Sequence, residues 1–376
     1  MKSILFSLLL LVCCAESQAQ HRVTVRVIVP PETPSDSSCF IAGNSPVLGD
    51  WNPGKIPMKQ ISDSLWEFSA NAPDGVLVEF KITRGSWHSQ AIYVRGVIPD
   101  NVRFVVRSDT VVTLRPVSWQ DLEAQSAGGI VGMVRYHRGL TGEGLRYPRD
   151  VIVWLPPSYE RSPRRRYPVL YMHDGQNVFD PSTSFIGFDW RADEVSDSLI
   201  KAGTIDELII VGIYNTPDRG IEYSDSLGRE YAHFVIHRLK PMIDSTYRTL
   251  PDAQHTAVMG SSMGGLISFL FSWWYPDVFS KAGCLSSAFL FDNGDILNEV
   301  RAYRGPRKKI RVYLDCGTID LDARLLPGSR EMAMLLRAKG YREGKDFELV
   351  VDRGATHNEH AWAARLWRPL TFLFGK

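Results

Sequence analysis

Hydrophobic and polar residues follow two different patterns along this chain. Between His21 and Trp119, short apolar runs alternate with turns rich in Pro, Gly and Asn. The clearest runs are residues 22–30, 39–43, 76–85 and 110–117. This spacing predicts short strands with almost no helix between them. About 100 residues of that kind are typical of a β-sandwich, so we expect an all-β domain over residues 20–119.

From about Ile130 onward, longer apolar runs alternate with amphipathic stretches. The apolar runs are residues 150–157, 167–175, 207–215, 255–262, 281–289, 309–317 and 346–354. Nearly continuous hydrophobicity is typical of strands buried on both faces of a parallel sheet. Residues 230–247 and 329–340 have helical periodicity, and Gly340 is placed to end the second helix. We therefore predict a doubly wound, mostly parallel α/β domain over residues 130–376, joined to the sandwich by a polar linker at 120–129.

The first twenty residues have the pattern of a secretory signal peptide. Lys2 precedes an apolar run from Ile4 to Cys14, and small residues follow up to Ala19. We expect cleavage after residue 19 and a secreted or periplasmic protein without stable membrane insertion. The alternatives are an uncleaved membrane anchor and a lipoprotein attached through a cysteine of this run. The run is shorter than the roughly 20 residues that span a bilayer, and no small residue precedes either cysteine.

Charge and cysteine content exclude several classes of protein. Lys and Arg total 43 and Asp and Glu 42, so the chain lacks the basic excess that nucleic-acid binding requires. After the signal peptide three cysteines remain, Cys39, Cys284 and Cys316. An odd number cannot form a complete disulfide framework, so we expect buried free thiols, with a Cys284–Cys316 bridge as the alternative. Their spacing with histidines matches no zinc site, and we predict neither a metal nor an organic cofactor.

A Gly-Ser-Ser-Met-Gly segment at 260–264 follows one apolar run and opens an apolar helix. Strand, tight turn and helix in that order are the context of a nucleophile elbow, which makes Ser262 the predicted nucleophile. The following helix N-terminus favours developing negative charge. An ordinary strand-to-helix turn and Ser261 as the nucleophile are the alternatives.

A serine nucleophile needs a base and an acid, which follow it in this fold in the order acid, then histidine. Only two of nine histidines, His357 and His360, come after Ser262. His357 follows the last apolar run and is our first choice, with His360 as the alternative. The loop after the preceding run offers Asp320 as the predicted acid and Asp322 as the second candidate.

Two backbone N–H groups are expected to bind the oxyanion. One belongs to Met263, next to the nucleophile, and the other is assigned to Gln176, in the loop after residues 167–175. His173 precedes Ser262 and is expected to be structural, as is Asp315 inside its strand. Arg219, after residues 207–215, is a candidate substrate-binding residue, and its alternative role is an ion pair with Glu222.

The region from about Gly129 to Lys376 resembles the putative esterase family, which includes esterase D, feruloyl and acetyl xylan esterases, enterochelin esterases and mycolyltransferases. The matching segments are residues 171–180, 219–223, 275–279, 313–318 and 354–362. The resemblance implies an α/β-hydrolase fold and a triad of Ser262, Asp320 and His357. In the mycolyltransferase branch the third residue of an Asp-Gly-x segment supplies the second oxyanion N–H, which here is Gln176.

The N-terminal region resembles a starch-binding carbohydrate module over about 80 residues. The matching segments are residues 40–44 and 48–53, with Trp66 and the strand that carries Lys81. The resemblance implies sugar contacts at Trp51 and Lys81. The family's second platform tryptophan has no counterpart here. Both glycan binding and a purely structural sandwich, framing the catalytic cleft with Trp87 or Trp51, remain open.

These observations predict a secreted serine esterase whose substrates are acetyl or feruloyl esters on polysaccharide. One alternative is a siderophore trilactone esterase, in which Arg219 would pair with an anionic catecholate. The other is a non-catalytic carbohydrate-binding protein, against which the complete set of Ser, acid and His in the correct order speaks. The sequence favours no particular oligomeric state.

Overall fold

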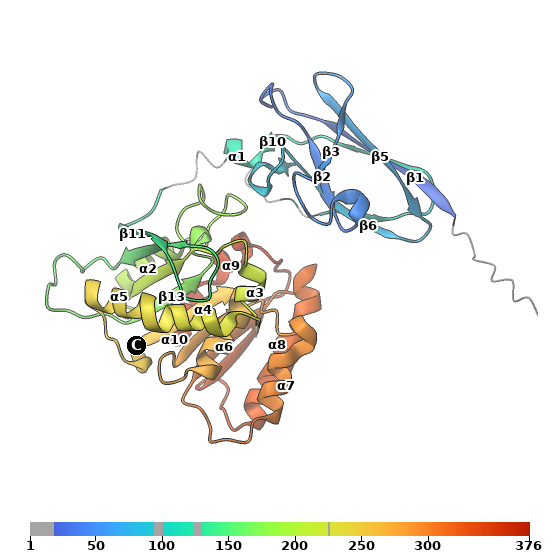
Figure 1. The fold of residues 1–376 in the computed structure, drawn as a ribbon. Helices are drawn as coiled ribbons and strands as arrows, with labels where there is room; N and C mark the ends of the chain where they lie inside the picture. Colours follow the sequence, from blue (N-terminus) through green and yellow to red (C-terminus); the bar gives the residue numbers. More distant parts are fainter. Residues whose placement is uncertain (1–18, 94–98, 100, 124–128, 225) are drawn as a thin grey trace, which may run out of the picture. The chain divides into compact units, whose positions relative to one another are not determined.

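The computed structural model describes residues 19–93, 99, 101–123, 129–224 and 226–376. The chain divides into two compact units, Met1–Glu123 and Ala124–Lys376, each described here by itself (Figure 1). The predicted signal peptide, apart from Ala19, lies outside the described residues, as does the middle of the predicted linker. Within the described part of the chain, no helix combines the length and the apolar character needed to cross a membrane.

The first unit consists of two four-stranded sheets, in the orders β4-β5-β1-β9 and β3-β2-β6-β8. The strands are β1 (Gln20–Ile28), β2 (Phe40–Gly43), β3 (Ile56–Pro57), β4 (Lys59–Gln60), β5 (Leu65–Pro73), β6 (Leu77–Thr83), β8 (Val102–Val105) and β9 (Thr110–Leu114). Short strands β7 (Ala91–Ile92) and β10 (Ser118–Trp119) pair with each other. Alternate side chains of the sheets, among them Val25, Ile41 and Phe80, form one apolar core. The predicted all-β domain is confirmed.

The second unit is built on an eight-stranded sheet in the order β11-β12-β14-β13-β15-β16-β17-β18. Its strands are β11 (Met133–Leu140), β12 (Arg149–Leu155), β13 (Val169–His173), β14 (Ile209–Ile213), β15 (Thr256–Ser261), β16 (Lys281–Leu285), β17 (Arg311–Cys316) and β18 (Phe347–Val351). Strands β11 and β12 are antiparallel to their neighbours, and the others run parallel. The sheet is mostly parallel, as predicted.

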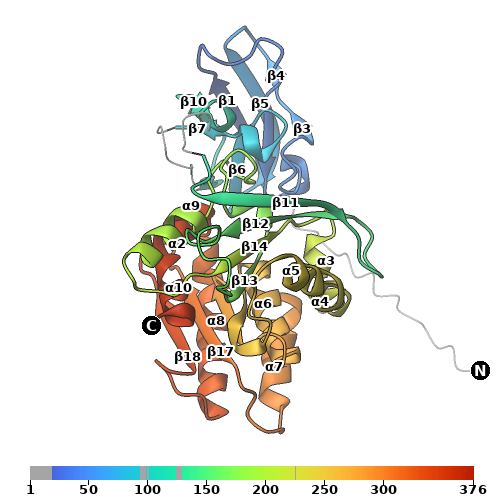
Figure 2. The same ribbon diagram turned by 90° about the vertical axis from the view of Figure 1, so that its left-hand side faces the viewer.

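Helices cover both faces of this sheet (Figure 2). They are α2 (Ala192–Lys201), α3 (Arg219–Glu222), α4 (Gly228–Phe234), α5 (Lys240–Thr246), α6 (Met263–Trp274), α7 (Asp295–Ala302), α8 (Leu321–Ala338), α9 (Glu359–Arg365) and α10 (Trp367–Phe374). Side chains of α4 to α8 pack into one core, and those of α2, α9 and α10 into the other. Strand β12 shows the division, because Val151 and Val153 point to the first core and Ile152 and Trp154 to the second.

Local details refine the predicted elements. The helix expected over residues 230–247 is interrupted by a π-helical turn, η5 (Val235–Leu239), between α4 and α5. Helix α8 begins eight residues earlier than expected, at Leu321 rather than 329, and ends before Gly340, whose φ of 85° is the predicted left-handed cap. Cys39, Cys284 and Cys316 are buried and free, which confirms the predicted free thiols.

Candidate active site

Ser262 occupies a sharp turn between β15 and α6. Its φ and ψ angles of 57° and −121° lie in a region that side chains rarely adopt, so the turn is held by its surroundings. The Ser262 N–H donates to the Leu285 carbonyl over 2.9 Å, and its own carbonyl accepts from Ala288 N–H at 3.0 Å. A Cβ at Gly260 would lie 2.7 Å from the carbonyl carbon of Gly264, so only glycine allows the helix to start so close to the strand. This geometry is that of a nucleophile elbow.

His357 lies after β18 and makes a short hydrogen bond to an acid. Its Nδ1 is 2.6 Å from Oδ1 of Asp322, which lies in the first turn of α8 after β17. The Asp322 side chain is fully buried, whereas 13% of the His357 side chain is exposed. A carboxylate on Nδ1 fixes the imidazole tautomer and leaves Nε2 to act as a base.

The acid beside His357 is therefore Asp322, the second candidate, and the expectation of Asp320 is corrected on this geometry. Asp320 precedes α8, with φ of 53° and ψ of −120°. Helix α8 begins between the two aspartates, so their side chains leave the backbone in different directions. The order of residues along the loop could not reveal where the helix begins.

Two further donors bind the carboxylate of Asp322. Asp322 Oδ2 accepts from the Gly317 N–H at 2.7 Å and from Ser286 Oγ at 2.8 Å. Burial alone would raise the pKa of Asp322, but the hydrogen bond from His357 and those from Ser286 and Gly317 outweigh it and lower the pKa below its usual value. Asp322 therefore stays ionised where His357 needs a negative partner.

A buried ion pair between Arg365 and Asp315 lies next to the Asp322 carboxylate. The sequence pointed to Asp315 but not to Arg365. Arg365 on α9 binds Asp315 through Nε at 3.0 Å and Nη2 at 3.2 Å. Its Nη2 also donates to Ser286 Oγ at 2.8 Å, and Trp362 Nε1 reaches the same oxygen at 3.1 Å. Asp315 is structural, as expected. The only signal for Arg365 was a charge within an apolar C-terminal helix.

Sheet topology brings the serine and the histidine–acid pair to the same edge of the sheet, the one formed by the carboxyl ends of its parallel strands. Strands β15, β16, β17 and β18 are consecutive parallel neighbours, so the segments that follow them leave the sheet at the same end. Ser262 follows the first of these strands, Asp322 the third and His357 the fourth. The turn after β16 connects them, because Leu285 accepts from Ser262 and Ser286 donates to Asp322. His360, the alternative base, is exposed on α9, where its ring contacts Phe188.

The two expected oxyanion donors also lie at this edge. Met263 is the first residue of α6, where backbone N–H groups have no acceptor within the helix. Gln176 lies in a 3₁₀ turn, η4 (Gly175–Asn177), directly after β13, the parallel neighbour of β15. A Cβ at Gly175 would lie 2.4 Å from the carbonyl carbon of Gly212, so glycine is required for the turn to pack against β14. Asn215 N–H donates to Gln176 Oε1 at 3.2 Å and fixes the side chain.

Arg219 pairs with Asp174 rather than with Glu222. Its Nε and Nη2 donate to the two carboxylate oxygens of Asp174 at 2.6 and 2.7 Å. Glu222 is bound instead by Arg149, and both of those side chains are completely buried. Burial would raise the pKa of Asp174, but Arg219 and Asn215 lower it below its usual value. Since Asp174 opens the turn that carries Gln176, Arg219 holds one side of the predicted oxyanion site.

His173 is structural in the described contacts. It is buried among aromatic rings, and its Nδ1 lies 2.9 Å from the hydroxyl of Tyr231. Burial lowers the pKa of His173 to about 3, because the cost of removing an imidazolium from water outweighs the opposing attraction of the nearby Asp174 carboxylate. A histidine that stays neutral and enclosed supports packing rather than proton transfer.

In the first unit, the residues expected to contact sugar have defined surroundings. Trp51 is half-buried, and its ring centroid lies 6.4 Å from that of Trp87 at an interplanar angle of 38°. The Lys81 ammonium donates to Gln90 Oε1 at 3.0 Å and to the Pro99 carbonyl at 2.8 Å. The tryptophan pair offers aromatic surface to a ligand, whereas the Lys81 ammonium already has protein partners.

Comparison with known proteins places both units in families. The sequence model described as "Putative esterase" matches residues 142–373, and the one described as "Starch binding domain" matches residues 20–113. An endo-1,4-beta-xylanase/feruloyl esterase of Xylanibacter ruminicola is 27% identical over 229 residues, which cover 59% of this chain and 29% of that protein.

Solved structures show the same fold. A ferulic acid esterase aligns with a TM-score of 0.54 at 24% identity, covering 64% of this chain and 98% of its own. The enterobactin esterase FES from Shigella flexneri aligns with a TM-score of 0.55 at 15% identity, covering 96% of this chain and 94% of its own. Both likenesses concern the fold alone. The family match extends over more than half of the chain, and the chain therefore belongs to the putative esterase family and is a carboxylic ester hydrolase with an N-terminal starch-binding-type domain.

Proposed function

We propose that this protein is a serine esterase that works through Ser262, His357 and Asp322. The observation that carries the proposal is the short His357–Asp322 contact at the same sheet edge as the strained turn of Ser262. Acyl transfer to a serine requires a nucleophile, a base and an acid that orients the base. Ser262 in its elbow, His357 and the buried Asp322 carboxylate are proposed to supply them.

The proposed reaction has two stages. Ser262 Oγ attacks the ester carbonyl while His357 Nε2 takes its proton, and Asp322 stabilises the imidazolium that forms. The N–H groups of Met263 and Gln176 bind the oxyanion of the tetrahedral intermediate. His357 then gives its proton to the leaving alcohol, which departs and leaves an acyl-enzyme on Ser262. In the second stage His357 deprotonates water, which releases the acid and restores the serine.

Apolar side chains in the segments that follow the strands at this end of the sheet support an aromatic acyl group in the substrate. Phe185, Ile221, Phe291 and Ile319 are each more than a third exposed. They follow β13, β14, β16 and β17, so they come from the same end of the sheet as Ser262. An acetyl group would leave most of this surface unused, whereas a feruloyl ring gains from apolar contact. We therefore favour feruloyl over acetyl esters.

The alcohol side is proposed to be a polysaccharide outside the cytoplasm. Three observations support this: the starch-binding match, the xylanase/feruloyl esterase relative, and the signal-peptide pattern of residues 1–19. In this account the Trp51–Trp87 pair provides the aromatic surface for glycan binding. Trp51→Ala is expected to weaken binding to soluble polysaccharide and to leave the turnover of methyl ferulate unchanged.

A siderophore trilactone is the second candidate, because the enterobactin esterase aligns over nearly the whole chain. The pairing of Arg219 argues against it. The Arg219 guanidinium keeps free N–H groups, but its charge is already balanced by the Asp174 carboxylate, so it attracts an anionic catecholate less than an unpaired cation would.

The test is acid release from feruloylated and acetylated xylan, methyl ferulate and a catecholate trilactone. We expect the highest kcat/KM for the feruloyl esters. Ser262→Ala should remove the activity, and Ser261→Ala, which changes the neighbouring buried serine, should retain most of it. Preferred cleavage of the trilactone would favour the second candidate, and an intact protein that hydrolyses none of these esters would contradict the proposal.

A further inference from the structure

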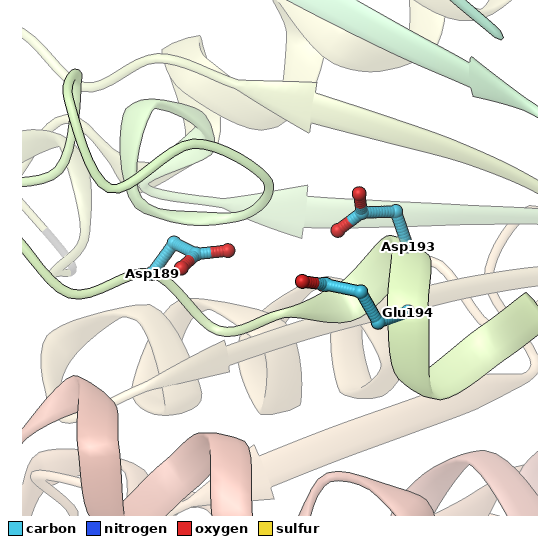
Figure 3. A group of neighbouring side chains, drawn as sticks. All are labelled: Asp189, Asp193 and Glu194. Carbon is cyan, nitrogen blue, oxygen red and sulfur yellow. The ribbon is translucent and has the colours of Figure 1, made fainter. Parts of the chain in front are cut away.

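Three carboxylates converge at the start of helix α2, and none of them has a part in the proposed ester hydrolysis. Asp189 comes from the loop before the helix, and Asp193 and Glu194 from its first turn (Figure 3). One oxygen from each lies within 4.8 Å of the others. The Asp193 side chain is completely buried and that of Asp189 nearly so.

The cluster has fewer positive partners than negative charges. Arg191 Nε lies 3.3 Å from Glu194 Oε1, but the Arg191 side chain is 63% exposed to solvent. Apart from a side-chain contact between Asp193 and Glu194, the other hydrogen bonds described for this cluster come from backbone N–H groups. Val131 N donates to Asp193 Oδ2 at 2.6 Å, and Arg191 N to Asp189 Oδ2 at 2.9 Å. Three carboxylates therefore share one solvated cation among the residues that the structure describes.

Two carboxylate oxygens in the cluster are buried without any hydrogen-bond partner in the described structure, Asp193 Oδ1 and Glu194 Oε2. Burial raises the pKa of Asp193, and the neighbouring Glu194 raises it further. Burial likewise raises the pKa of Asp189 to about 6. The positive end of α2 explains an acidic residue in its first turn, but it provides no donor for these two oxygens. Buried acceptors without donors are rare and costly.

We infer that Asp189, Asp193 and Glu194 bind a divalent cation, and that Ca²⁺ is the ion that fits. Carboxylate oxygens are hard ligands, and a 2+ charge would balance the excess negative charge that Arg191 leaves. Mg²⁺ keeps several waters and takes one or two carboxylates in strict octahedral geometry. Three carboxylates from an irregular loop and a helix start suit the flexible coordination of Ca²⁺ better.

The position of the site gives the ion a structural consequence. The segment between β13 and α2 folds back on the η4 turn, because Trp190 N–H donates to the Asn177 carbonyl at 2.8 Å. Earlier in the same segment, Thr183 Oγ1 donates to the Gln176 carbonyl at 2.7 Å. A cation at Asp189 would fasten the helix end of this segment. We therefore expect ion binding to increase the stability of the protein whether or not it hydrolyses esters.

Binding can be measured directly with Tb³⁺ as the probe. Trp190 is adjacent to Asp189 and can transfer excitation energy to a bound lanthanide. The protein is first dialysed against EDTA, then titrated with Tb³⁺ under tryptophan excitation, and finally titrated with Ca²⁺ as competitor. We expect saturable luminescence that Ca²⁺ displaces and Mg²⁺ displaces poorly. CaCl₂ should also raise the unfolding temperature by several degrees relative to EDTA.

Asp193→Asn removes one charge with little change in shape. It should lower the affinity for Ca²⁺ about tenfold or more and abolish the rise in unfolding temperature that CaCl₂ causes. The matched control is Asp197→Asn, one turn later on α2, where the side chain pairs with Lys201 instead. This control should bind as the unaltered protein does. If Asp193→Asn fails to fold, Asp189→Asn tests the same loss.

Two outcomes would overturn the inference. One is an unaltered protein that shows neither sensitised luminescence nor a Ca²⁺-dependent unfolding temperature at millimolar ion, in which case the carboxylates share protons instead. The other is an Asp193→Asn variant that binds Ca²⁺ as tightly as the unaltered protein, which would place the ion elsewhere. Neither readout depends on esterase activity, so failure here leaves the proposed function intact.

Discussion

His357 and Asp322 are joined by a 2.6 Å contact between imidazole Nδ1 and carboxylate Oδ1, although 35 positions separate them in the sequence. The carboxylate is completely buried and accepts two further hydrogen bonds through Oδ2. A carboxylate held this firmly fixes both the orientation and the tautomer of the imidazole. In the proposed mechanism this contact leaves Nε2 as the nitrogen of His357 that transfers the proton.

Asp322→Asn is expected to lower kcat for ester hydrolysis by about a thousandfold to ten-thousandfold, because the amide no longer stabilises the imidazolium and favours the wrong tautomer. The matched control is Asp320→Asn, two residues earlier, which should retain most of the activity. Steady-state kinetics on methyl ferulate measure both variants, and thermal unfolding shows whether Asp322→Asn is folded. A larger loss for Asp320→Asn would show that the acid was wrongly assigned.

The buried neutral His173 predicts a pH dependence of stability. The pKa of His173 in the folded protein is about 3, below the value of about 6.5 in an unfolded chain. Between these values only the unfolded state binds the proton, so the free energy of unfolding falls as the pH falls, by about 1.4 kcal/mol per pH unit from this residue.

The check is denaturant unfolding of the unaltered protein and of His173→Asn between pH 7 and pH 4. The variant is expected to be less stable at pH 7, because it loses packing. Its free energy of unfolding should fall less steeply with falling pH, because unfolding of the variant takes up nearly one proton fewer. Identical slopes for the two proteins would mean that His173 does not titrate with a lowered pKa.

Arg219→Ala tests whether the Arg219–Asp174 pair positions the oxyanion turn or binds substrate. Removing the guanidinium leaves the buried Asp174 carboxylate without its strongest partner, which should cost about 1 to 3 kcal/mol of stability, since Arg219 is itself partly exposed. We expect kcat to fall by a similar factor for neutral and anionic esters, with little change in KM. A rise in KM confined to anionic esters would instead identify Arg219 as a substrate-binding residue.

Sequence patterns predicted much of this molecule, for physical reasons that individual elements show. A buried parallel strand needs apolar residues on both faces, so runs such as 255–262 were recognisable, and a tight turn into a helix needs the glycines around Ser262. The last apolar run, residues 346–354, likewise predicted a final strand with His357 directly after it.

The remaining features depended on contacts between distant segments. Asp320 precedes helix α8 and Asp322 lies in its first turn, so the choice between them depends on where the helix begins. Helix boundaries are difficult to locate from a sequence pattern. The partner of Arg219 is Asp174, 45 positions away, where the nearby Glu222 was the simpler expectation. The cluster of Asp189, Asp193 and Glu194 looks in the sequence like a solvated helix start, and only its burial distinguishes it.

The most direct test of the central claim is to trap the acyl-enzyme. The protein is mixed with 4-nitrophenyl acetate in rapid flow, the initial burst of 4-nitrophenol is measured, and the acylated peptide is identified by mass spectrometry. We predict a burst of about one equivalent, an acetyl group on Ser262, an unchanged burst for Ser261→Ala and none for Ser262→Ala. A full burst from Ser262→Ala, or an acetyl group carried by Ser261, would contradict the account.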